Sequence, residues 1–198
     1  MRDWDARFSE PGYAYGTDPN QFLEAVACQI PQGPVLCLAE GQGRNAAFLA
    51  GLGHRVTAMD QSAAGLARAR ELAQQKGVTI EFVHADLADF AIAPGAWAGI
   101  ISIFAHVPQE LRRSVHERVV AGLRPGGVFI LEAYSVRQLT FGTGGPKDAH
   151  VLPTRDALEQ ELRGLDFVLL QEAERDVVEG RYHTGRAAVV QVLARKPA

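Results

Sequence analysis

The sequence is poor in cysteine, and it lacks a long uninterrupted apolar run. Only Cys28 and Cys37 occur among its 198 residues, which excludes a small scaffold held together by several disulfides. No segment reaches the roughly 20 apolar residues that a membrane-spanning helix needs. The first twelve residues, MRDWDARFSEPG, show none of the regions of a signal peptide. We therefore expect a cytoplasmic protein that has no membrane partner.

An excess of basic charge is also missing. Lys and Arg number 20 against 23 Asp and Glu, for a net charge of -3. Because phosphate backbones are bound by basic surfaces, this balance argues against a nucleic-acid partner. No Cys, His or Asp cluster has the spacing of metal ligands, so we predict no metal. With 47% hydrophobic residues, the whole of 1–198 suits one globular domain, whose oligomeric state the sequence leaves open.

Strand-like and helix-like segments alternate along most of the chain, which predicts βαβ units and a parallel sheet. Near the C-terminus two strand-like runs, FVLLQEAERDVV and AAVVQVLAR, follow each other without a helix between them, which predicts an antiparallel hairpin. The expected fold is a Rossmann-like, doubly wound α/β sheet, mostly parallel, with this C-terminal β-hairpin. Strands are expected at 34–39, 54–60, 79–86, 97–107 and 124–134, and helices at 19–30, 44–52, 62–77 and 108–122.

The turn after the first expected strand is rich in glycine. Gly41 and Gly43 let the backbone approach a ligand closely, and the helix that begins near Arg44 directs N–H groups into the same crevice. Dinucleotide-binding dehydrogenases share this pattern, and a plain tight turn would show it too. Asp60 ends the second strand, where it could accept both ribose hydroxyls, and Asp86 ends the third, near an adenine amino group. In this order the residues predict an adenosine site.

With these residues the chain resembles the class I S-adenosylmethionine (SAM)-dependent methyltransferases, and among them the small bacterial tellurite-resistance (TehB-like) enzymes. The matching stretches are YAYGTDPN, LAEGQGRNA, TAMDQS, ADL, LRPGGVFILE and TGGP. The resemblance implies a seven-stranded sheet, one SAM per chain and an N-terminal lid segment, residues 1–18, over the cofactor. The expected cofactor residues are Tyr15, Glu40, Gly41, Gly43, Arg44, Asn45, Asp60, Gln61, Asp86, Leu87 and Phe104.

One position departs from the family's first motif, which usually runs acid, Leu, Gly, Cys, Gly, x, Gly. Here Cys37 stands where the acid is expected and Glu40 where the Cys is expected. A thiol cannot anchor the methionine ammonium as a carboxylate can, so we expect Glu40 to restore that charge beside the glycine turn. The alternative is a solvated loop glutamate.

Candidates for the acceptor side lie at the ends of the fourth and fifth strands. His106 could act as a base or orient the substrate, although a histidine that bonds to backbone at a helix start would look the same. Tyr134 is the second catalytic candidate. Residues 135–153 form a long loop on the substrate side, in which Arg137, Lys147 and His150 could give the wall a positive character. The hairpin tip, RYHTGR, is expected to be a solvated turn that could reach the pocket.

These features predict a SAM-dependent methyltransferase acting on a small soluble acceptor, with a thiol or a chalcogen anion or oxyanion as the favoured class. SAM carries an activated methyl group, so the protein needs chiefly to orient the acceptor. A soft anion needs no base, whereas a hydroxyl or a protonated amine does. The alternatives are an NAD(P)-dependent oxidoreductase, which would share the glycine turn, and a non-catalytic SAM-binding protein.

Overall fold

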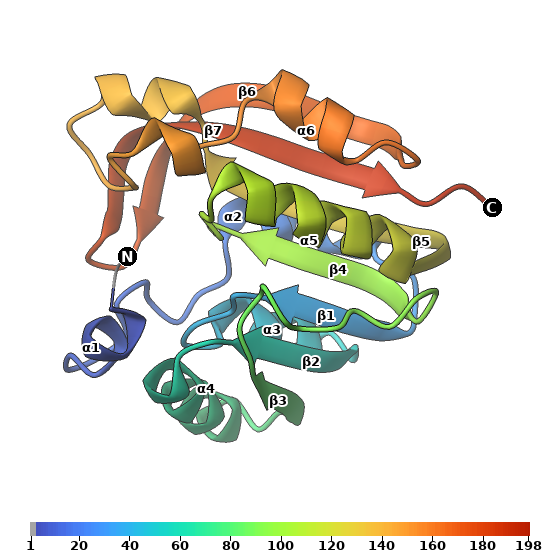
Figure 1. Cartoon of the computed structure of the whole chain (residues 1–198). Coiled ribbons are helices and arrows are strands. Elements are labelled where there is room, and N and C mark those ends of the chain that lie inside the picture. The colour runs from blue at the N-terminus through green and yellow to red at the C-terminus, as the bar shows by residue number, and fades with distance from the viewer. Residues whose placement is uncertain (1–2) are drawn as a thin grey trace.

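Seven strands form one sheet in the computed structural model, which describes residues 3–198. The order across the sheet is β3-β2-β1-β4-β5-β7-β6, so the winding direction reverses between β1 and β4. Strands β1 to β5 pair in parallel, and β7 runs antiparallel to both β5 and β6. This confirms the expected fold class and hairpin (Figure 1). The strands are β1 (Pro34–Leu38), β2 (Arg55–Asp60), β3 (Ile80–His84), β4 (Trp97–Ile103), β5 (Leu123–Tyr134), β6 (Asp166–Glu179) and β7 (His183–Arg195).

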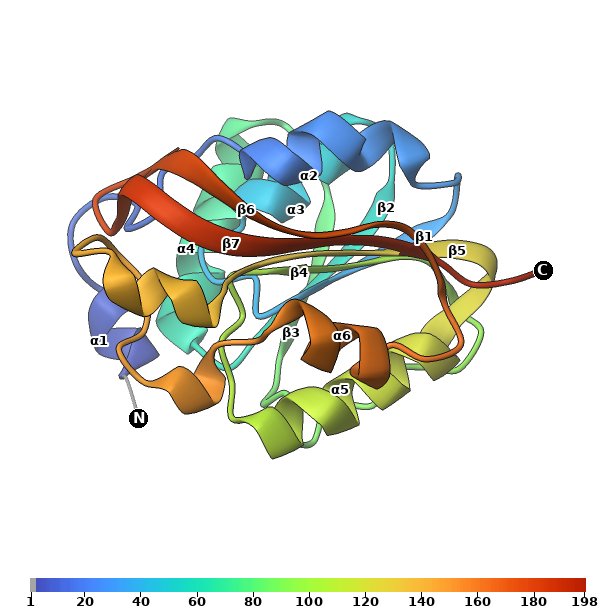
Figure 2. The same ribbon diagram turned by 90° about the horizontal axis from the view of Figure 1, so that it is seen from above.

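Helices cover both faces of the sheet (Figure 2). One face carries α2 (Gln21–Val26), α3 (Arg44–Gly51) and α4 (Ala63–Gln75), and the other carries α5 (Gln109–Gly122) and α6 (Arg155–Glu161). Ser62 caps α4 by accepting a hydrogen bond from the Gly65 backbone N–H, as its position before the helix predicts. Among residues 3–198, no helix is long and apolar enough to cross a membrane.

Strand β1 shows why the sheet is buried on both sides. Its alternate side chains Leu36 and Leu38 belong to the core under α5 and α6, whereas Val35 and Cys37 belong to the core under α2 and α3. All four are almost fully buried. Burial raises the pKa of the Cys37 thiol well above its usual value, so Cys37 packs as a small apolar residue and carries no charge toward a ligand.

The structure differs from the sequence-based expectations at the end of β4. This strand stops at Ile103, not at residue 107, because Phe104 takes a positive φ of 54° that a strand cannot continue. Its backbone N–H still donates to the Glu132 carbonyl at 2.7 Å, which anchors the turn to β5. Residues 104–108 therefore leave the sheet as a loop at the carboxyl end of β4.

Short helices also occupy segments for which no regular structure was predicted. In the N-terminal lid segment lies α1 (Trp4–Phe8), capped by the Asp3 side chain. The long loop after β5 contains the 3-10 helices η2 (Val136–Thr140) and η3 (Ala149–Val151). A third 3-10 helix, η1 (Ala27–Gln29), extends α2 and lies inside the helix predicted at 19–30. These elements are only one or two turns long, so they give little hydrophobic periodicity for a sequence to reveal.

A buried network of polar side chains fastens the hairpin to the rest of the fold. Glu132 on β5 has no exposed surface. Its carboxylate accepts hydrogen bonds from Asn20 Nδ2, from Gln191 Nε2 at 2.7 Å and from Arg175 Nε and Nη2 at 2.9 and 2.6 Å. Glu179 accepts from the same asparagine and the same arginine, each at 2.9 Å. The N-terminal segment, β5 and both hairpin strands thus meet around two carboxylates.

Candidate functional site

A cavity of about 520 Å³ opens at the carboxyl ends of β1, β2 and β4, where the winding direction reverses. This is the place where open α/β sheets bind ligands, and the volume lies within the range of small-molecule sites. The turns after the first four strands, the lid segment, the loop after β5 and the hairpin tip all contribute walls. Most of the expected site residues line this cavity: Tyr15, Glu40, Gly41, Arg44, Asn45, Asp60, Gln61, Asp86, Leu87, Phe104 and His106.

Gly43 is not among the lining residues, and its conformation explains why glycine is needed there. Its φ is 87°, and a Cβ on it would lie 2.7 Å from Ala69 Cβ on α4. A side chain would therefore push α3 and α4 apart. Gly41 also has a positive φ, 61°, and a Cβ on it would lie 2.8 Å from Phe8 Cζ in α1. The two glycines therefore allow α3 to pack closely against α4, and they allow Phe8 of the lid segment to lie against the turn.

Asp60 holds the glycine turn through its carboxylate. One oxygen accepts from the Gly41 N–H at 2.7 Å and the other from the Ser62 N–H at 2.8 Å. Burial raises the pKa of Asp60, against the opposing effect of these two amides. Each carboxylate oxygen retains a further lone pair, so the group could hold the turn and accept ligand hydroxyls at the same time.

Glu40 lies half-buried at the start of α3. Gly43, at the N-cap position of this helix, has no side chain to accept from the first turn. Glu40 Oε1 does so, accepting from the Ala46 N–H at 2.8 Å. Burial raises its pKa to about 7, against the opposing effects of that amide and of the Arg44 charge. The group therefore titrates near neutral pH and could bind a cation in its ionised form.

The lid segment is held at α1 by contacts with α4. Asp5 accepts from Ser62 Oγ at 2.6 Å and from the Ala64 N–H at 3.0 Å. Phe8 is 4% exposed and packs over the glycine turn, and Trp4 joins it in lining the cavity. The lid segment therefore forms one wall of the cavity with aromatic side chains.

The hairpin tip holds the other end of the lid segment. Tyr182 Oη donates to Glu10 at 2.6 Å, and the Arg181 N–H donates to the Ala14 carbonyl at 3.0 Å. Inside the cavity, Arg44 forms a buried ion pair with Glu179, so α3 is tied to the same tip. Sequence order gives no hint of these contacts, because the tip follows the lid by more than 160 positions.

His106 lies in the loop after β4, and its ring is fixed by the backbone of β5. The Tyr134 N–H donates to His106 Nε2 at 3.0 Å. A backbone N–H can only donate, so this ring nitrogen carries no proton, and the proton of the neutral imidazole sits on Nδ1. A proton on Nε2 would place two hydrogen-bond donors, this ring N–H and the Tyr134 backbone N–H, face to face. His106 therefore lines the cavity with its basic nitrogen already engaged.

Tyr134 does not line the cavity. Its side chain is 1% exposed and lies behind Gly145, where an added Cβ would be 2.8 Å from the Tyr134 ring. Burial raises the pKa of its hydroxyl well above the usual value. The geometry thus does not support the expected role of Tyr134 as a proton acceptor from substrate, and its ring instead stacks on His106 at 5.6 Å between centroids.

His183 is one of the cavity residues for which the sequence does not predict a role in the site. It was placed in a solvated turn, but it is only 9% exposed and lines the cavity. Its ring centroid lies 4.3 Å from that of Tyr15 and 4.5 Å from that of Phe104. These two neighbours come from the lid segment and from the loop after β4, so only the fold reveals that the histidine is enclosed.

The loop at 135–153 does not supply the positive wall that its sequence suggested. Arg137 points to Glu174 on β6, and Lys147 Nζ donates to the Thr143 carbonyl at 3.2 Å. Neither residue lines the cavity, and the exposed His150 does not line it either. The loop residues that do so are Gly145, Pro146, Asp148 and Val151. This part of the wall is therefore apolar and acidic.

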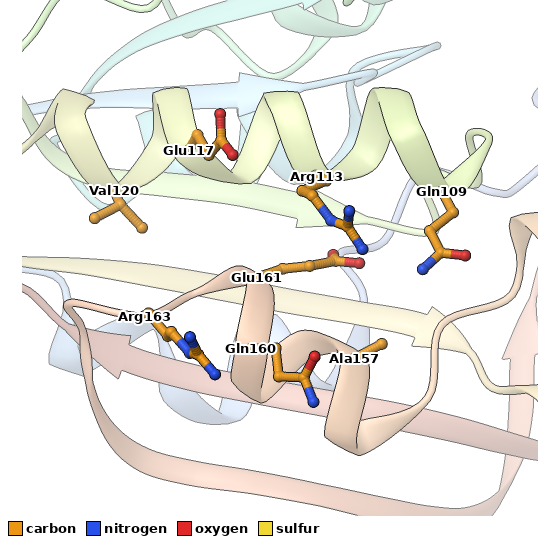
Figure 3. A pocket seen from close by; sticks show the side chains of 8 residues that line it. All are labelled: Gln109, Arg113, Glu117, Val120, Ala157, Gln160, Glu161 and Arg163. Carbon is orange, nitrogen blue, oxygen red and sulfur yellow. The ribbon is translucent and has the colours of Figure 1, made fainter.

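A second hollow, of about 600 Å³, lies between α5 and α6 (Figure 3). Arg113 and Arg163 line it together with Glu117 and Glu161, so opposite charges balance along it. Glu161 is itself engaged by the guanidinium of Arg112, at 3.0 and 2.9 Å. The two hollows share no lining residue, and the glycine turn and the acidic strand ends line only the first cavity. Across residues 3–198, no three His, Cys, Asp or Glu side chains gather in a way that could hold a metal ion.

Comparison with known proteins agrees with this geometry. Residues 35–127 match the family model of the methyltransferase domain. The tRNA 5-carboxymethoxyuridine methyltransferase of Escherichia coli K12 is 32% identical over 140 residues, which cover 63% of this chain and 53% of that protein. TehB from Haemophilus influenzae superposes with a TM-score of 0.75 at 21% identity, over 98% of this chain and 67% of that one. A protein solved in work on the conversion of a disulfide bond into a thioacetal group during echinomycin biosynthesis superposes with a TM-score of 0.78 at 21% identity, over 98% and 90%.

Residues 35–127 thus match a methyltransferase domain, and the chain shares the fold of solved SAM-dependent methyltransferases. SAM is the cofactor that these matches support. The matches do not favour the NAD(P)-dependent oxidoreductase that the glycine turn alone allows. The chain spans about half the length of the E. coli relative, since the match covers 53% of it.

Proposed function

We propose that this protein transfers the methyl group of SAM to a small molecule, at a soft or already deprotonated atom, without a base from the protein. The observation that carries the proposal is the hydrogen bond from the Tyr134 N–H to His106 Nε2, which occupies the basic nitrogen of the expected catalytic histidine. Tyr134 itself is buried behind the loop. Both groups that the sequence suggests as proton acceptors, His106 and Tyr134, are thus engaged in contacts that hold the fold together.

The proposed cofactor position follows the order of the strand ends. The Asp60 carboxylate accepts the ribose hydroxyls, and Asp86 with Leu87 borders the adenine. Glu40 pairs with the methionine ammonium beside the glycine turn. All four residues line the same cavity, which supports this placement. The sulfonium then lies toward the loop after β4, with its methyl group facing Phe104 and His106.

The proposed reaction is a single displacement. The acceptor atom attacks the methyl carbon with a lone pair, and the bond from that carbon to the sulfonium breaks with its electrons moving to sulfur, which leaves S-adenosylhomocysteine. A proton on the acceptor atom, where one exists, is lost to solvent. The protein contributes orientation and exclusion of water, and orientation alone is worth about 7–11 kcal/mol of the barrier.

Three observations favour a small acceptor over the tRNA that the E. coli relative methylates. The cavity of about 520 Å³ must hold the cofactor as well as the acceptor. The lid segment covers one side with Trp4 and Phe8. The net charge of -3 does not favour binding to a phosphate backbone. Release of S-adenosylhomocysteine from labelled SAM, with small thiols and amines in one set of assays and bulk tRNA in another, tests this choice. Turnover with tRNA alone would reject it.

Replacing His106 with asparagine should lower kcat by less than about ten-fold at saturating acceptor, because no proton passes through the imidazole. The amide oxygen can accept from the Tyr134 N–H in its place. The measurement is S-adenosylhomocysteine release, whose pH profile should follow the pKa of the acceptor. The control is His150→Asn on the exposed loop, which should change nothing. A loss of a hundred-fold or more with unchanged SAM affinity would identify His106 as a base.

The affinity for SAM should rise with pH, and Glu40 should cause the rise. Because its pKa is raised to about 7, Glu40 is protonated in the free protein below that pH and must lose the proton to pair with an ammonium. We expect on the order of a ten-fold gain between about pH 5.5 and 7, where an α-ammonium stays charged. Glu40→Gln should weaken SAM binding and flatten this dependence, as measured by calorimetry across pH. Adenosine lacks the ammonium and should be little affected; equal losses for both ligands would refute the pairing.

A further inference from the structure

The charges that line the cavity are mostly negative. Four acidic residues line it: Glu40 and Asp60, and the more exposed Asp86 and Asp148. One guanidinium faces it, that of Arg44, and its charge is paired with the buried Glu179. Apart from the imidazoles of His106 and His183, the lining residues within 3–198 therefore offer no further basic side chain to an anionic acceptor.

The acceptor half of the cavity is apolar as well. Beyond the expected position of the methyl group, the loop after β4 contributes Phe104, Val107 and Pro108, and the loop after β5 contributes Pro146 and Val151. A small oxyanion placed there would leave its hydration shell, and these side chains would give it no lysine or arginine as a partner. Apolar walls instead stabilise a molecule that buries carbon surface.

Asp148 is the charged residue on the acceptor side of this cavity. One of its oxygens accepts from the His150 N–H at 2.9 Å, which fixes the carboxylate at the start of η3. The basic residues of the same loop are directed elsewhere, since Lys147 bonds to the Thr143 carbonyl and Arg137 pairs with Glu174. The loop thus presents an acid to the cavity and keeps its bases outside.

We propose that the methyl acceptor is a small apolar molecule that is neutral or positively charged apart from its reacting atom, and that Asp148 selects for this charge. This inference rests on the proposed function, because it names the class of substrate for the same cavity. It excludes small oxyanions of sulfur, selenium or tellurium as substrates. It also gives the loop after β5 a role in specificity, separate from the cofactor residues on the other side of the cavity.

The test uses three probes of the same size that differ in charge: benzylamine, benzyl alcohol and benzoate. Each is titrated by saturation-transfer NMR against protein saturated with S-adenosylhomocysteine, whose binding is first verified by calorimetry. We expect benzylamine and benzyl alcohol to bind at least about ten-fold more tightly than benzoate, because only benzoate faces Asp148 with like charge. Equal or tighter binding of benzoate would overturn the inference, and so would the failure of all three probes to bind.

The variant Asp148→Lys should reverse the ranking, with benzoate gaining on the order of ten-fold relative to benzylamine. Asp156→Lys makes the same charge change on α6 outside the cavity and should leave the ranking as it is. An unchanged ranking in Asp148→Lys would show that Asp148 does not select the acceptor. Failure of S-adenosylhomocysteine to bind would instead reject the proposed function, so the two failures are distinguishable.

Discussion

Replacing Asp60 with alanine is expected to weaken SAM binding by roughly ten- to a hundred-fold. Hydrogen bonds to charged groups are worth about 1.5–3 kcal/mol, and the ribose would lose a carboxylate acceptor. The same substitution removes the partner of the Gly41 N–H, which now donates to Asp60 at 2.7 Å, and of the Ser62 N–H at 2.8 Å. Calorimetric titration with SAM measures the loss, alongside circular dichroism to verify the fold.

A pair of nucleosides separates the ribose contact from the support of the turn. Adenosine should lose most of its affinity in Asp60→Ala. 2′,3′-Dideoxyadenosine, which lacks the 2′- and 3′-hydroxyls, should lose little beyond the effect of a distorted turn. Asp89→Ala removes an exposed acid that does not line the cavity and is the matched control. Equal losses for the two nucleosides would show that Asp60 acts only on the turn and would place the ribose elsewhere.

The residues on the side of the cavity proposed for the cofactor could be selected from the sequence because their signals are local. Gly41 and Gly43 adopt the positive φ values that favour glycine. Asp60 follows its strand directly, and Ser62 caps the next helix as its position suggests. Once a parallel sheet is assumed, strand ends must meet at one edge, so the order of these residues along the chain already places them around one crevice.

The acceptor side was harder to predict because it is assembled from distant segments. His183 is enclosed by Tyr15 and Phe104, which lie far from it in the chain, and no short motif joins the three. The positive φ of Phe104 ended β4 early, although the residues around it read as a continuing apolar strand. In the long loop, the sequence shows that bases and acids are present. Only the structure shows that Arg137 pairs with Glu174 on β6, that Lys147 bonds within the loop, and that Asp148 lines the cavity.

The buried network around Glu132 could not be predicted from the sequence either, because a glutamate in a strand usually points toward solvent. Replacing Glu132 with alanine is expected to lower the free energy of unfolding by about 3–5 kcal/mol, the cost of removing one member of a buried ion pair. The carboxylate has no exposed surface, and its loss removes one of the two carboxylates that pair with Arg175. Asn20 and Gln191 each lose one hydrogen-bond acceptor as well. Urea unfolding followed by circular dichroism measures the change.

Glu174 on the same hairpin provides the matched control. Its carboxylate pairs with Arg137 and Arg186, but its side chain is 31% exposed, so Glu174→Ala should cost less than about 1 kcal/mol. Glu132→Gln keeps the shape of the side chain and removes the charge, and we expect a loss between those of the other two variants. Because Glu179 shares Asn20 and Arg175 with Glu132 and also holds Arg44 in the cavity, a loosened network should weaken SAM binding even where the protein stays folded. A Glu132→Ala protein within 1 kcal/mol of the original would show that the hairpin is held by its apolar contacts alone.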